Sequence, residues 1–322
     1  MRSIPHPPAL VEAIRSAGLF GVFQIGMMTH DAGLISAFVE RWHPETHTFH
    51  FSFGEATITL EDVYYILGLP VGGYPVFTEE GLPDASLVLE VLGVDPNIVD
   101  EERSTATTIQ KGGINILWLV NNFVDCARIE YGRDDYKAQL LFHRYAHILI
   151  LLGSLFPHSS GNRLPLRLIH YVCDLDRVSQ YSWGSACLAY LYKHLCDTSI
   201  GKKIELCGSM TLLQVWIYEH FPGLCPTHRQ SYLIHHPRAL RFFRIPLKYA
   251  NVPFKNSRGT RFELDSMSES GFKWRPYLDS APEAMSITDR EREVMSAQCP
   301  LIFERVVEWC YTDRVTRQFG FL

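Results

Sequence analysis

The amino-acid sequence predicts a mainly α-helical, compact domain with one small β-hairpin near residues 47–59 and a short strand close to the C-terminus. Three observations predict this fold class. Apolar residues recur at spacings of three and four in several segments, which is the period of one buried helix face. Around residues 49–58 they alternate with polar residues, which is the period of a strand. Residue types that start and stop helices border many of the helical segments.

Helices are expected along most of the chain. The predicted helical segments are 8–17, 32–42, 60–69, 84–92, 114–123, 134–152, 164–176, 180–196, 212–221, 289–299 and 313–319. The clearest start signals are two spacings typical of a capping box, Thr59 with Asp62 and Thr288 with Glu291. Ser209 precedes another helix as an N-cap residue. Segment 114–123 is apolar on most sides, which predicts a buried helix.

Strands are expected at two places. Alternating Phe residues up to Gly54, followed by alternation of Ala and Ile with Thr, predict the hairpin. Residues 301–309 are rich in Val, Ile and Phe and predict the C-terminal strand. Because prolines punctuate the chain after residue 222, we expect one domain over 1–322 with a looser C-terminal subregion, 223–322.

Composition excludes several classes of protein. The chain has 322 residues, 47% of them hydrophobic and 20% charged, with a net charge of -5, so it is neither disordered nor fibrous. Its eight cysteines are few for a secreted disulfide scaffold of this length, contain no CxxC pair and lie partly in apolar helical patterns, which favours a reducing compartment, the nucleus or the cytosol. The N-terminus lacks the apolar core of a signal peptide, and the most apolar segment, 140–156, carries His and Arg, so we expect no contact with a membrane.

Charges are separated along the sequence. Between Arg41 and Arg103 there are twelve acidic residues and no Lys or Arg. Residues 220–262 contain no acid and interleave cations with aromatic residues, which makes them a candidate nucleic-acid or partner surface. Its cations are Arg229, Arg238, Arg241, Arg244, Lys248, Lys255, Arg258 and Arg261. The alternative is that they pair with the chain's own acids, which a pI near 6.3 favours.

No pattern in the sequence indicates catalysis or a cofactor. The GxSxG, GxxxxGK[ST] and GxGxxG patterns do not occur, and no Lys lies in a cofactor motif. Cys225 and His228 have the spacing of metal ligands, with His220, His235 and His236 nearby. Because adjacent His side chains in a strand point to opposite faces, a second ligand pair is poorly formed, and we expect no metal site. An uncharacterised enzymatic activity is the second alternative function.

Two local clusters have structural and functional interpretations. His47, Phe49, His50 and Glu55 lie across the predicted hairpin, where a cross-strand His–Glu pair is usually structural, with an interaction surface as the alternative. The sequence Ser-Trp-Gly-Ser at 182–185 places Gly between two hydroxyl groups. On a helix, this pattern more often reflects close packing than nucleophilic chemistry.

Several long segments resemble one known family. They are ERWHPETHTFHFSFGEATITLEDVYYILGLPVGG (40–73), INILWLVNNF (114–123), LLGSLFP (151–157), SGNRLPLRLIHYVCDLDRVSQYSWGSACLAYLYKHLCD (160–197), LLQVWIYEHFPGL (212–224) and FERVVEWCYTDRVTRQFG (303–320). In this order and over nearly the whole chain, they resemble the plant mobile domain family. The chain departs from the family pattern at Ala56, Cys310 and Thr312, which argues against an essential thiol at position 56 or imidazole at position 310.

The resemblance implies a non-enzymatic nuclear domain associated with transposon silencing, regulated gene expression, genome stability and meristem maintenance. It also implies a PPP-class serine/threonine phosphatase-like partner, a type of domain that is fused to the mobile domain in some family chains. Contact with DNA or chromatin is an expectation by analogy with other mobile-element proteins. No catalytic residue carries over. The family-motif residues, expected to be structural, are Trp42, His47, Phe49, Gly54, Glu55, Trp183, Gly184, Trp309, Arg314 and Phe319.

Overall fold

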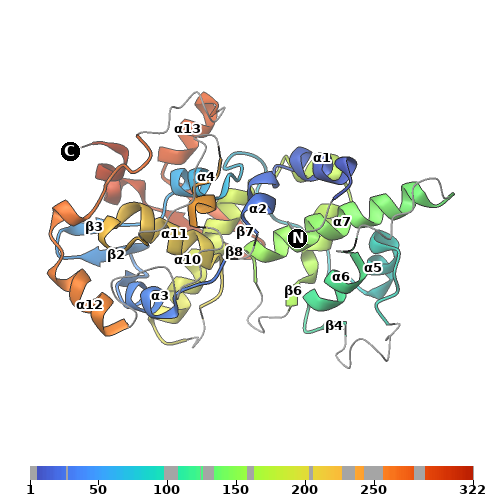
Figure 1. Ribbon diagram of the computed structural model, residues 1–322, viewed down its shortest axis with the longest axis horizontal. Helices are drawn as coiled ribbons and strands as arrows, with labels where there is room; N and C mark the ends of the chain where they lie inside the picture. The colour runs from blue at the N-terminus through green and yellow to red at the C-terminus, as the bar shows by residue number, and fades with distance from the viewer. Residues whose placement is uncertain are drawn as a thin grey trace. The chain divides into compact units, whose positions relative to one another are not determined.

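The computed structural model describes residues 6–26, 28–97, 108–123, 125, 134–157, 163–202, 206–226, 236–242, 257–278 and 287–321 (Figure 1). Over these residues the chain is mainly helical with small antiparallel sheets, which confirms the predicted fold class. Its contacts form two compact units: unit 1 comprises 1–24 and 77–181, and unit 2 comprises 25–76 and 182–322. Each unit is discontinuous in sequence, and the single-domain organisation over 1–322 stays a prediction.

Unit 1 is built around one long helix, α7 (Tyr136–Leu155), against which α1, α5 and α6 pack. The other helices are α1 (Pro8–Ser16), α2 (Phe20–Ile25, ending at the unit boundary), α5 (Ala85–Leu92), α6 (Ile116–Phe123), η2 (Leu166–Leu168), α8 (Ile169–Val172) and α9 (Leu175–Val178). A three-stranded antiparallel sheet, ordered β4-β5-β6, completes the unit. Its strands are β4 (Ile109–Gln110), β5 (Gly113–Asn115) and β6 (Arg163–Pro165).

This sheet corrects two predictions. Residues expected at the starts of helices 114–123 and 164–176 are strands instead, because Ile114 pairs with Leu164 across β5 and β6. That pairing joins segments fifty residues apart, so no local pattern could reveal it. The helix expected to be buried all round, α6, buries Leu119 and Phe123 but leaves Leu117 56% exposed.

Unit 2 centres on α10 (Trp183–Ser199), which packs against α4 and against both C-terminal strands. The other helices are α3 (Ala32–Val39), α4 (Leu60–Leu67), α11 (Met210–His220), η3 (Pro222–Leu224), η4 (Arg238–Phe242), α12 (Ser257–Ser266), η6 (Glu269–Gly271), α13 (Asp289–Ser296) and η8 (Thr312–Phe319). Its strands are β1 (Trp42–His43), β2 (Thr48–Phe51), β3 (Gly54–Ala56), β7 (Cys299–Phe303) and β8 (Val306–Cys310).

The helix starts predicted from capping patterns are confirmed. Thr59 and Asp62 form a reciprocal capping box at α4, and Thr288 and Glu291 form another at α13. The side chain of Ser209 accepts a hydrogen bond from the backbone of the first turn of α11. These caps satisfy amide groups that the first turn of a helix otherwise leaves without partners.

The β structure of unit 2 is more extensive than the sequence predicts. The hairpin near residues 47–59 is confirmed as β2 and β3, but α3 ends at Val39 and the next residues form β1, where Trp42 pairs with Phe49. The single strand expected over 301–309 is a two-stranded hairpin, because Glu304 takes a left-handed conformation (φ 54°) and reverses the chain.

Aromatic side chains fill the core beneath the first sheet. Phe49 is fully buried and lies against the rings of Phe38, Trp42 and Trp216, at centroid distances of 4.9–5.8 Å. None of the helices described is long and apolar enough to cross a membrane.

Candidate functional site

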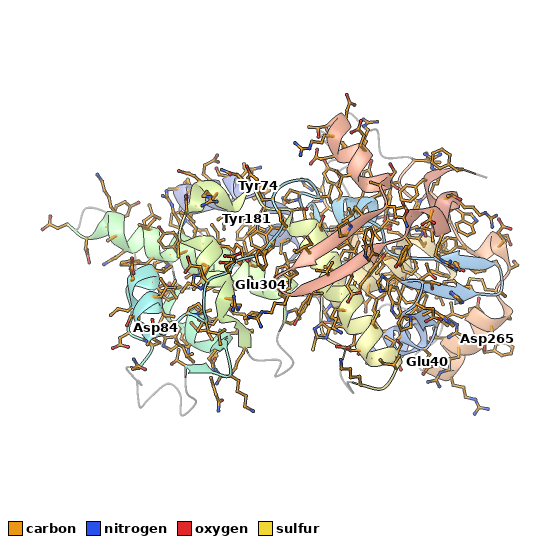
Figure 2. The ribbon with its side chains drawn as sticks, turned by 180° about the vertical axis from the view of Figure 1, so that it is seen from behind. Glu40, Tyr74, Asp84, Tyr181, Asp265 and Glu304 are labelled. Atoms are coloured by element: carbon orange, nitrogen blue, oxygen red, sulfur yellow. The ribbon has the colours of Figure 1, made fainter. Side chains whose placement is uncertain are left out.

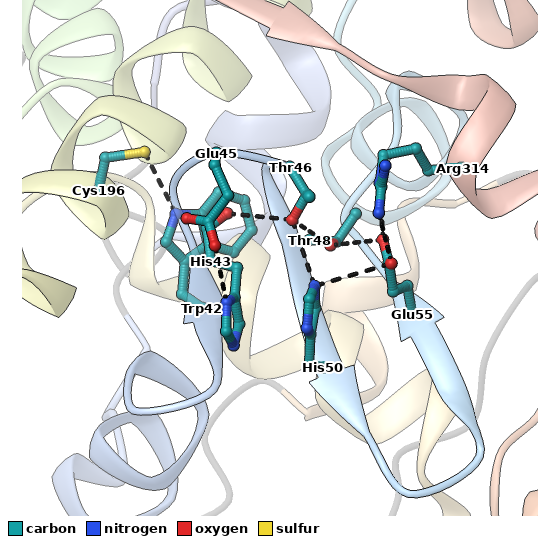
Figure 3. A network of polar contacts seen from close by, with 9 residues as sticks. All are labelled: Trp42, His43, Glu45, Thr46, Thr48, His50, Glu55, Cys196 and Arg314. Atoms are coloured by element: carbon teal, nitrogen blue, oxygen red, sulfur yellow. Dashed lines mark hydrogen bonds and ion pairs between the residues drawn. The ribbon is translucent and has the colours of Figure 1, made fainter.

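A polar network covers one face of the sheet β1–β3 (Figure 3). The rings of His43 and His50 stack with their centroids 3.7 Å apart. His50 is the register partner of Glu55, and its Nε2 atom lies 3.8 Å from a carboxylate oxygen of that residue. Thr48 donates a hydrogen bond of 3.0 Å to the same carboxylate. The predicted cross-strand His–Glu pair is therefore confirmed.

Arg314 connects this face to η8. Its Nε and Nη2 atoms donate to the two carboxylate oxygens of Glu55 at 2.8 and 2.6 Å. The hydrogen bonds from Arg314 lower the pKa of Glu55, although partial burial opposes the shift. Such a bidentate pair is specific in geometry, and it fixes the C-terminal segment against the hairpin.

A second cluster surrounds His47, in the turn between β1 and β2. This residue has φ 51°, a conformation that non-glycine residues seldom adopt. Its ring contacts those of Trp42 and Tyr311, with centroids 6.1 and 5.7 Å away. Its Nδ1 atom lies 2.7 Å from the backbone oxygen of Trp309, and its Nε2 atom lies 3.1 Å from Oε2 of Glu308.

Cys196, near the end of α10, completes this cluster. The indole N–H of Trp42 donates to its Sγ atom at 3.2 Å (Figure 3). The ligand-type atoms of His47, Cys196 and Glu308 all lie within 4.8 Å of one another. Burial disfavours a charged His47, but its hydrogen bonds with Cys196, Glu308 and the backbone prevail and raise its pKa to about 10. The sequence analysis named only His47, because the three residues lie in distant parts of the chain.

A third cluster is buried in the core of unit 2. The carboxylate of Asp62 accepts hydrogen bonds from Tyr277 at 2.6 Å and from Thr59 at 2.7 Å, and His220 Nε2 lies 2.8 Å from it. Asp62 and His220 are each 1% exposed. An Asp–His–Tyr group resembles a catalytic set, but Asp62 and His220 are enclosed in the core, and only Tyr277 reaches the lining of a pocket. The cluster therefore stabilises the fold.

The described part of the basic stretch is largely paired within the protein. In η4, Nη1 of Arg238 lies 3.0 Å from Oε2 of Glu219, and Nη1 of Arg241 lies 2.9 Å from Oε1. Arg238 and Glu219 are both buried. The alternative of internal pairing is thus supported for these two cations, although their acidic partner is Glu219 on α11 and not the acid-rich segment 42–102.

The other cations of the basic stretch 220–262 are paired, exposed or outside the described residues. Arg261 on α12 donates to both carboxylate oxygens of Glu40, and this bonding lowers the pKa of Glu40. Arg41 in turn bonds to Asp265, so two ion pairs connect α12 with the end of α3. Figure 2 labels Glu40 and Asp265, the acidic residues of the two pairs. Arg258 is exposed on α12. Four cations lie outside the described residues, namely Arg229, Arg244, Lys248 and Lys255.

Other residues singled out in the sequence lie in packed positions. A Cβ atom on Gly184 would stand 2.8 Å from the backbone oxygen of Pro70, so glycine permits α10 to approach that loop closely. Ser182 and Ser185 both donate to the backbone oxygen of Val71, at 2.6 and 3.1 Å. Trp183 is fully buried. These contacts confirm close packing as the interpretation of the Ser-Trp-Gly-Ser pattern.

Two further features from the sequence analysis are the Cys225–His228 spacing and the glycine of the hairpin. Cys225 is buried, whereas His228 lies outside the described residues, so their pairing as metal ligands stays untested. Gly54 has φ 132° at the hairpin turn and open space beside it.

A pocket of about 240 Å³ opens beside α4. Its lining includes Glu61, Tyr277, Arg275, Arg292 and Phe319. Burial, with the neighbouring Asp62 carboxylate, raises the pKa of Glu61 to about 7, although Arg275 opposes the shift. The pocket places one carboxyl group beside two exposed arginines, and the hydroxyl-bearing residues Tyr65, Tyr277 and Ser296 also line it.

An apolar strip lies on the outer face of the C-terminal hairpin. Val307 and Trp309 are 56% and 45% exposed, and alternate residues of a strand share a face. Their register partners on β7 are Ile302 and Pro300, which extend the strip across both strands. Trp309 was expected to be structural, and its indole instead stands at the surface.

The comparisons with known proteins identify the family. The plant mobile domain matches residues 18–322. Three relatives are from Arabidopsis thaliana. "Serine/threonine-protein phosphatase 7 long form homolog" is 33% identical over 99% of this chain and 24% of that protein. "Protein MAIN-LIKE 2" is 32% identical over 97% of this chain and 45% of that protein. "Protein MAINTENANCE OF MERISTEMS" is 30% identical over 96% of this chain and 61% of that protein.

This chain thus spans between 24% and 61% of the length of these relatives. No solved structure matches it significantly. The match to the family covers more than nine-tenths of the sequence. The chain belongs to the plant mobile domain family.

Proposed function

We propose that this chain is a non-enzymatic nuclear interaction domain that docks a PPP-class serine/threonine phosphatase-like protein. In this role it acts in transposon silencing, gene expression and genome stability, including meristem maintenance. The observation that carries the proposal is the apolar strip formed by Pro300, Ile302, Val307 and Trp309. Exposed Trp is strongly enriched among residues that dominate binding energy at protein interfaces, and contiguous exposed apolar residues often mark interaction sites.

The kind of partner is suggested by one relative. A domain similar to this chain makes up about a quarter of a protein named as a phosphatase 7 long form homolog. The rest of that protein is additional sequence. Domains that are joined in one protein can also associate as separate chains, and this supports a phosphatase-like partner for the strip.

A binding role also fits the chemistry of the described residues. The most catalytic-looking group, Asp62 with His220 and Tyr277, is almost entirely buried. The cysteines that the structure describes are free thiols, which suits a reducing compartment such as the nucleus. DNA binding through the basic stretch is less favoured, because Arg238 and Arg241 are committed to Glu219.

The proposal is tested by measuring the affinity of the full chain for a phosphatase-like partner by calorimetry. Trp309→Ala and Val307→Glu are the variants, and Ile200→Glu is the control because Ile200 is equally apolar and 65% exposed at the end of α10. We expect each strip variant to raise the dissociation constant by at least about tenfold, as substitutions at interface hot spots do. The control should bind the partner with the affinity of the wild type. A wild-type chain that forms no complex, or strip variants that bind like the control, would contradict the proposal.

A further inference from the structure

Three side chains from separate parts of unit 2 converge on a small space near the C-terminal hairpin. His47 comes from the turn between β1 and β2, Cys196 from the last turns of α10, and Glu308 from β8. The imidazole, thiol and carboxylate atoms all lie within 4.8 Å of one another. In a tetrahedral zinc site with bonds of about 2.0–2.3 Å, ligand atoms lie about 3.3–3.8 Å apart, so small side-chain rotations bring these three atoms to that geometry.

We propose that His47, Cys196 and Glu308 bind one Zn²⁺ ion. The donor set is one nitrogen, one sulfur and one oxygen atom, and each is a common zinc ligand. Imidazole and thiolate together favour a borderline-soft cation over Mg²⁺ or Ca²⁺, which prefer oxygen ligands alone. Three ligands from the protein leave a fourth position for a water molecule.

The groups around the imidazole orient it for metal binding. The Nδ1 atom of His47 is 2.7 Å from the backbone oxygen of Trp309, a distance at which Nδ1–H donates to that oxygen. Nε2 is then the atom on the side of Glu308, 3.1 Å from its Oε2, and a bound Zn²⁺ takes the place of the proton that joins these two atoms in the free protein. A His ligand that donates its other N–H to a backbone carbonyl is a recurrent arrangement in metal sites, because it fixes the tautomer and the ring plane.

A second interaction prepares the sulfur. The indole N–H of Trp42 donates to Sγ of Cys196 at 3.2 Å, which holds the sulfur in place beside the imidazole. The ring of Trp42 is nearly parallel to that of His47, with an interplanar angle of 14°. One tryptophan therefore positions two of the three ligands.

Burial and backbone strain also favour a bound cation. The side chains of His47 and Glu308 are only 10% and 15% exposed, so their interaction is largely shielded from water. When Cys196 binds the ion as a thiolate, the divalent cation offsets the repulsion between that sulfur and the nearby Glu308 carboxylate. The left-handed backbone at His47 is the kind of local strain that persists where a side chain must be aimed.

The test uses the full chain, stripped with a chelator and then loaded with Zn²⁺. We expect one tightly bound zinc per chain by elemental analysis after desalting. With Co²⁺ in place of zinc, we expect thiolate-to-metal charge-transfer absorption in the near ultraviolet. The ligand variants are His47→Gln, Cys196→Ser and Glu308→Gln, and Cys173→Ser is the matched control because Cys173 is an exposed thiol in unit 1.

Each ligand variant should weaken zinc binding by at least about 100-fold, since loss of an outer hydrogen bond alone costs 10–100-fold. The control should bind zinc as the wild type does. Trp42→Phe keeps the ring and removes the N–H donor, and should weaken binding by about tenfold. Zinc should raise the melting temperature of the wild type and of the control but not of Cys196→Ser, because only a folded site binds the ion.

A substitution at a more buried position could impair folding. Glu308→Gln keeps the shape of a partly exposed side chain, so its zinc affinity can be measured on a folded chain. The proposal is overturned if the wild type binds no zinc, or if Cys196→Ser and Glu308→Gln retain it at wild-type affinity. It is also overturned if Cys225→Ser loses the ion while the three ligand variants keep it, because the site would then lie at Cys225.

Discussion

Arg238 and Glu219 form a buried ion pair in which Nη1 of the guanidinium lies 3.0 Å from Oε2 of the carboxylate. Arg241 approaches the other oxygen of the same carboxylate at 2.9 Å. Two residues from a stretch that appears in the sequence as a basic surface therefore hold η4 against α11.

Arg238→Met should destabilise the protein without a specific effect on nucleic-acid binding. Removing one partner of a buried ion pair costs about 3–5 kcal/mol, and because Arg241 still neutralises Glu219, we expect about 3 kcal/mol. The free energy of unfolding from urea denaturation measures the loss. Arg258→Met, at an exposed position on α12, is the control and should change it by less than about 0.5 kcal/mol. A stable Arg238→Met variant that had lost affinity for DNA would point instead to a nucleic-acid surface.

Gly184→Ala should be destabilising because the added Cβ meets backbone. It would lie 2.8 Å from the oxygen of Pro70 and 2.9 Å from Cγ1 of Val71. The start of α10 or the loop 70–71 must then shift, and overpacking of this kind costs about 1–3 kcal/mol. Gly223→Ala is the matched control, since no atom lies within 4 Å of its added Cβ. Thermal unfolding of both variants checks this, and equal melting temperatures would show that α10 can move away from the loop without cost.

The two capping boxes should differ in strength because one is buried and the other is exposed. Thr59 is 2% exposed, and its hydroxyl also donates to Asp62, which accepts from the core residue Tyr277. Thr59→Ala should therefore cost about 2–3 kcal/mol, as for a buried hydrogen bond to a charged group. Thr288→Ala at the exposed cap of α13 should cost about 1 kcal/mol. The difference is read from urea denaturation, and equal losses would mean that the Asp62 network adds nothing to the cap.

Glu61 should make stability depend on pH. Burial and the Asp62 carboxylate raise its pKa from 4.5 to about 7. The folded state then holds this proton more tightly than the unfolded state does. The contribution of Glu61 to stability is therefore greatest below pH 4.5, and it falls as pH rises through about 7.

Glu61→Gln removes that titration. At about pH 8 the variant should be more stable than the wild type by about 1–2 kcal/mol, after allowance for partial exposure of the pocket. At about pH 4.5 the difference should nearly vanish. Urea denaturation at several pH values measures how the free energy of unfolding of the wild type and of the variant depends on pH. Glu293→Gln, on the exposed face of α13, is the control. A wild-type pH profile that the Gln variant reproduces would contradict the assignment to Glu61.

The sequence by itself determined the features whose causes are local. A capping box involves residues only three positions apart, so the patterns at Thr59 and Thr288 predict where α4 and α13 begin. Alternation around Phe49 predicts β2 and β3 because the side chains of a strand alternate between two faces. The mainly helical class and the family resemblance rest on signals of the same kind, repeated along the chain.

Only the tertiary structure decided which distant residues meet. Ile114 becomes a strand residue because Leu164 lies beside it, and Glu219 rather than the acid-rich segment 42–102 receives Arg238 and Arg241. The same holds for Cys196, which lies near His47 and Glu308 although more than a hundred residues separate it from each. Periodicity and capping act over a few residues, whereas these pairings depend on how whole elements pack, and no local pattern encodes that arrangement.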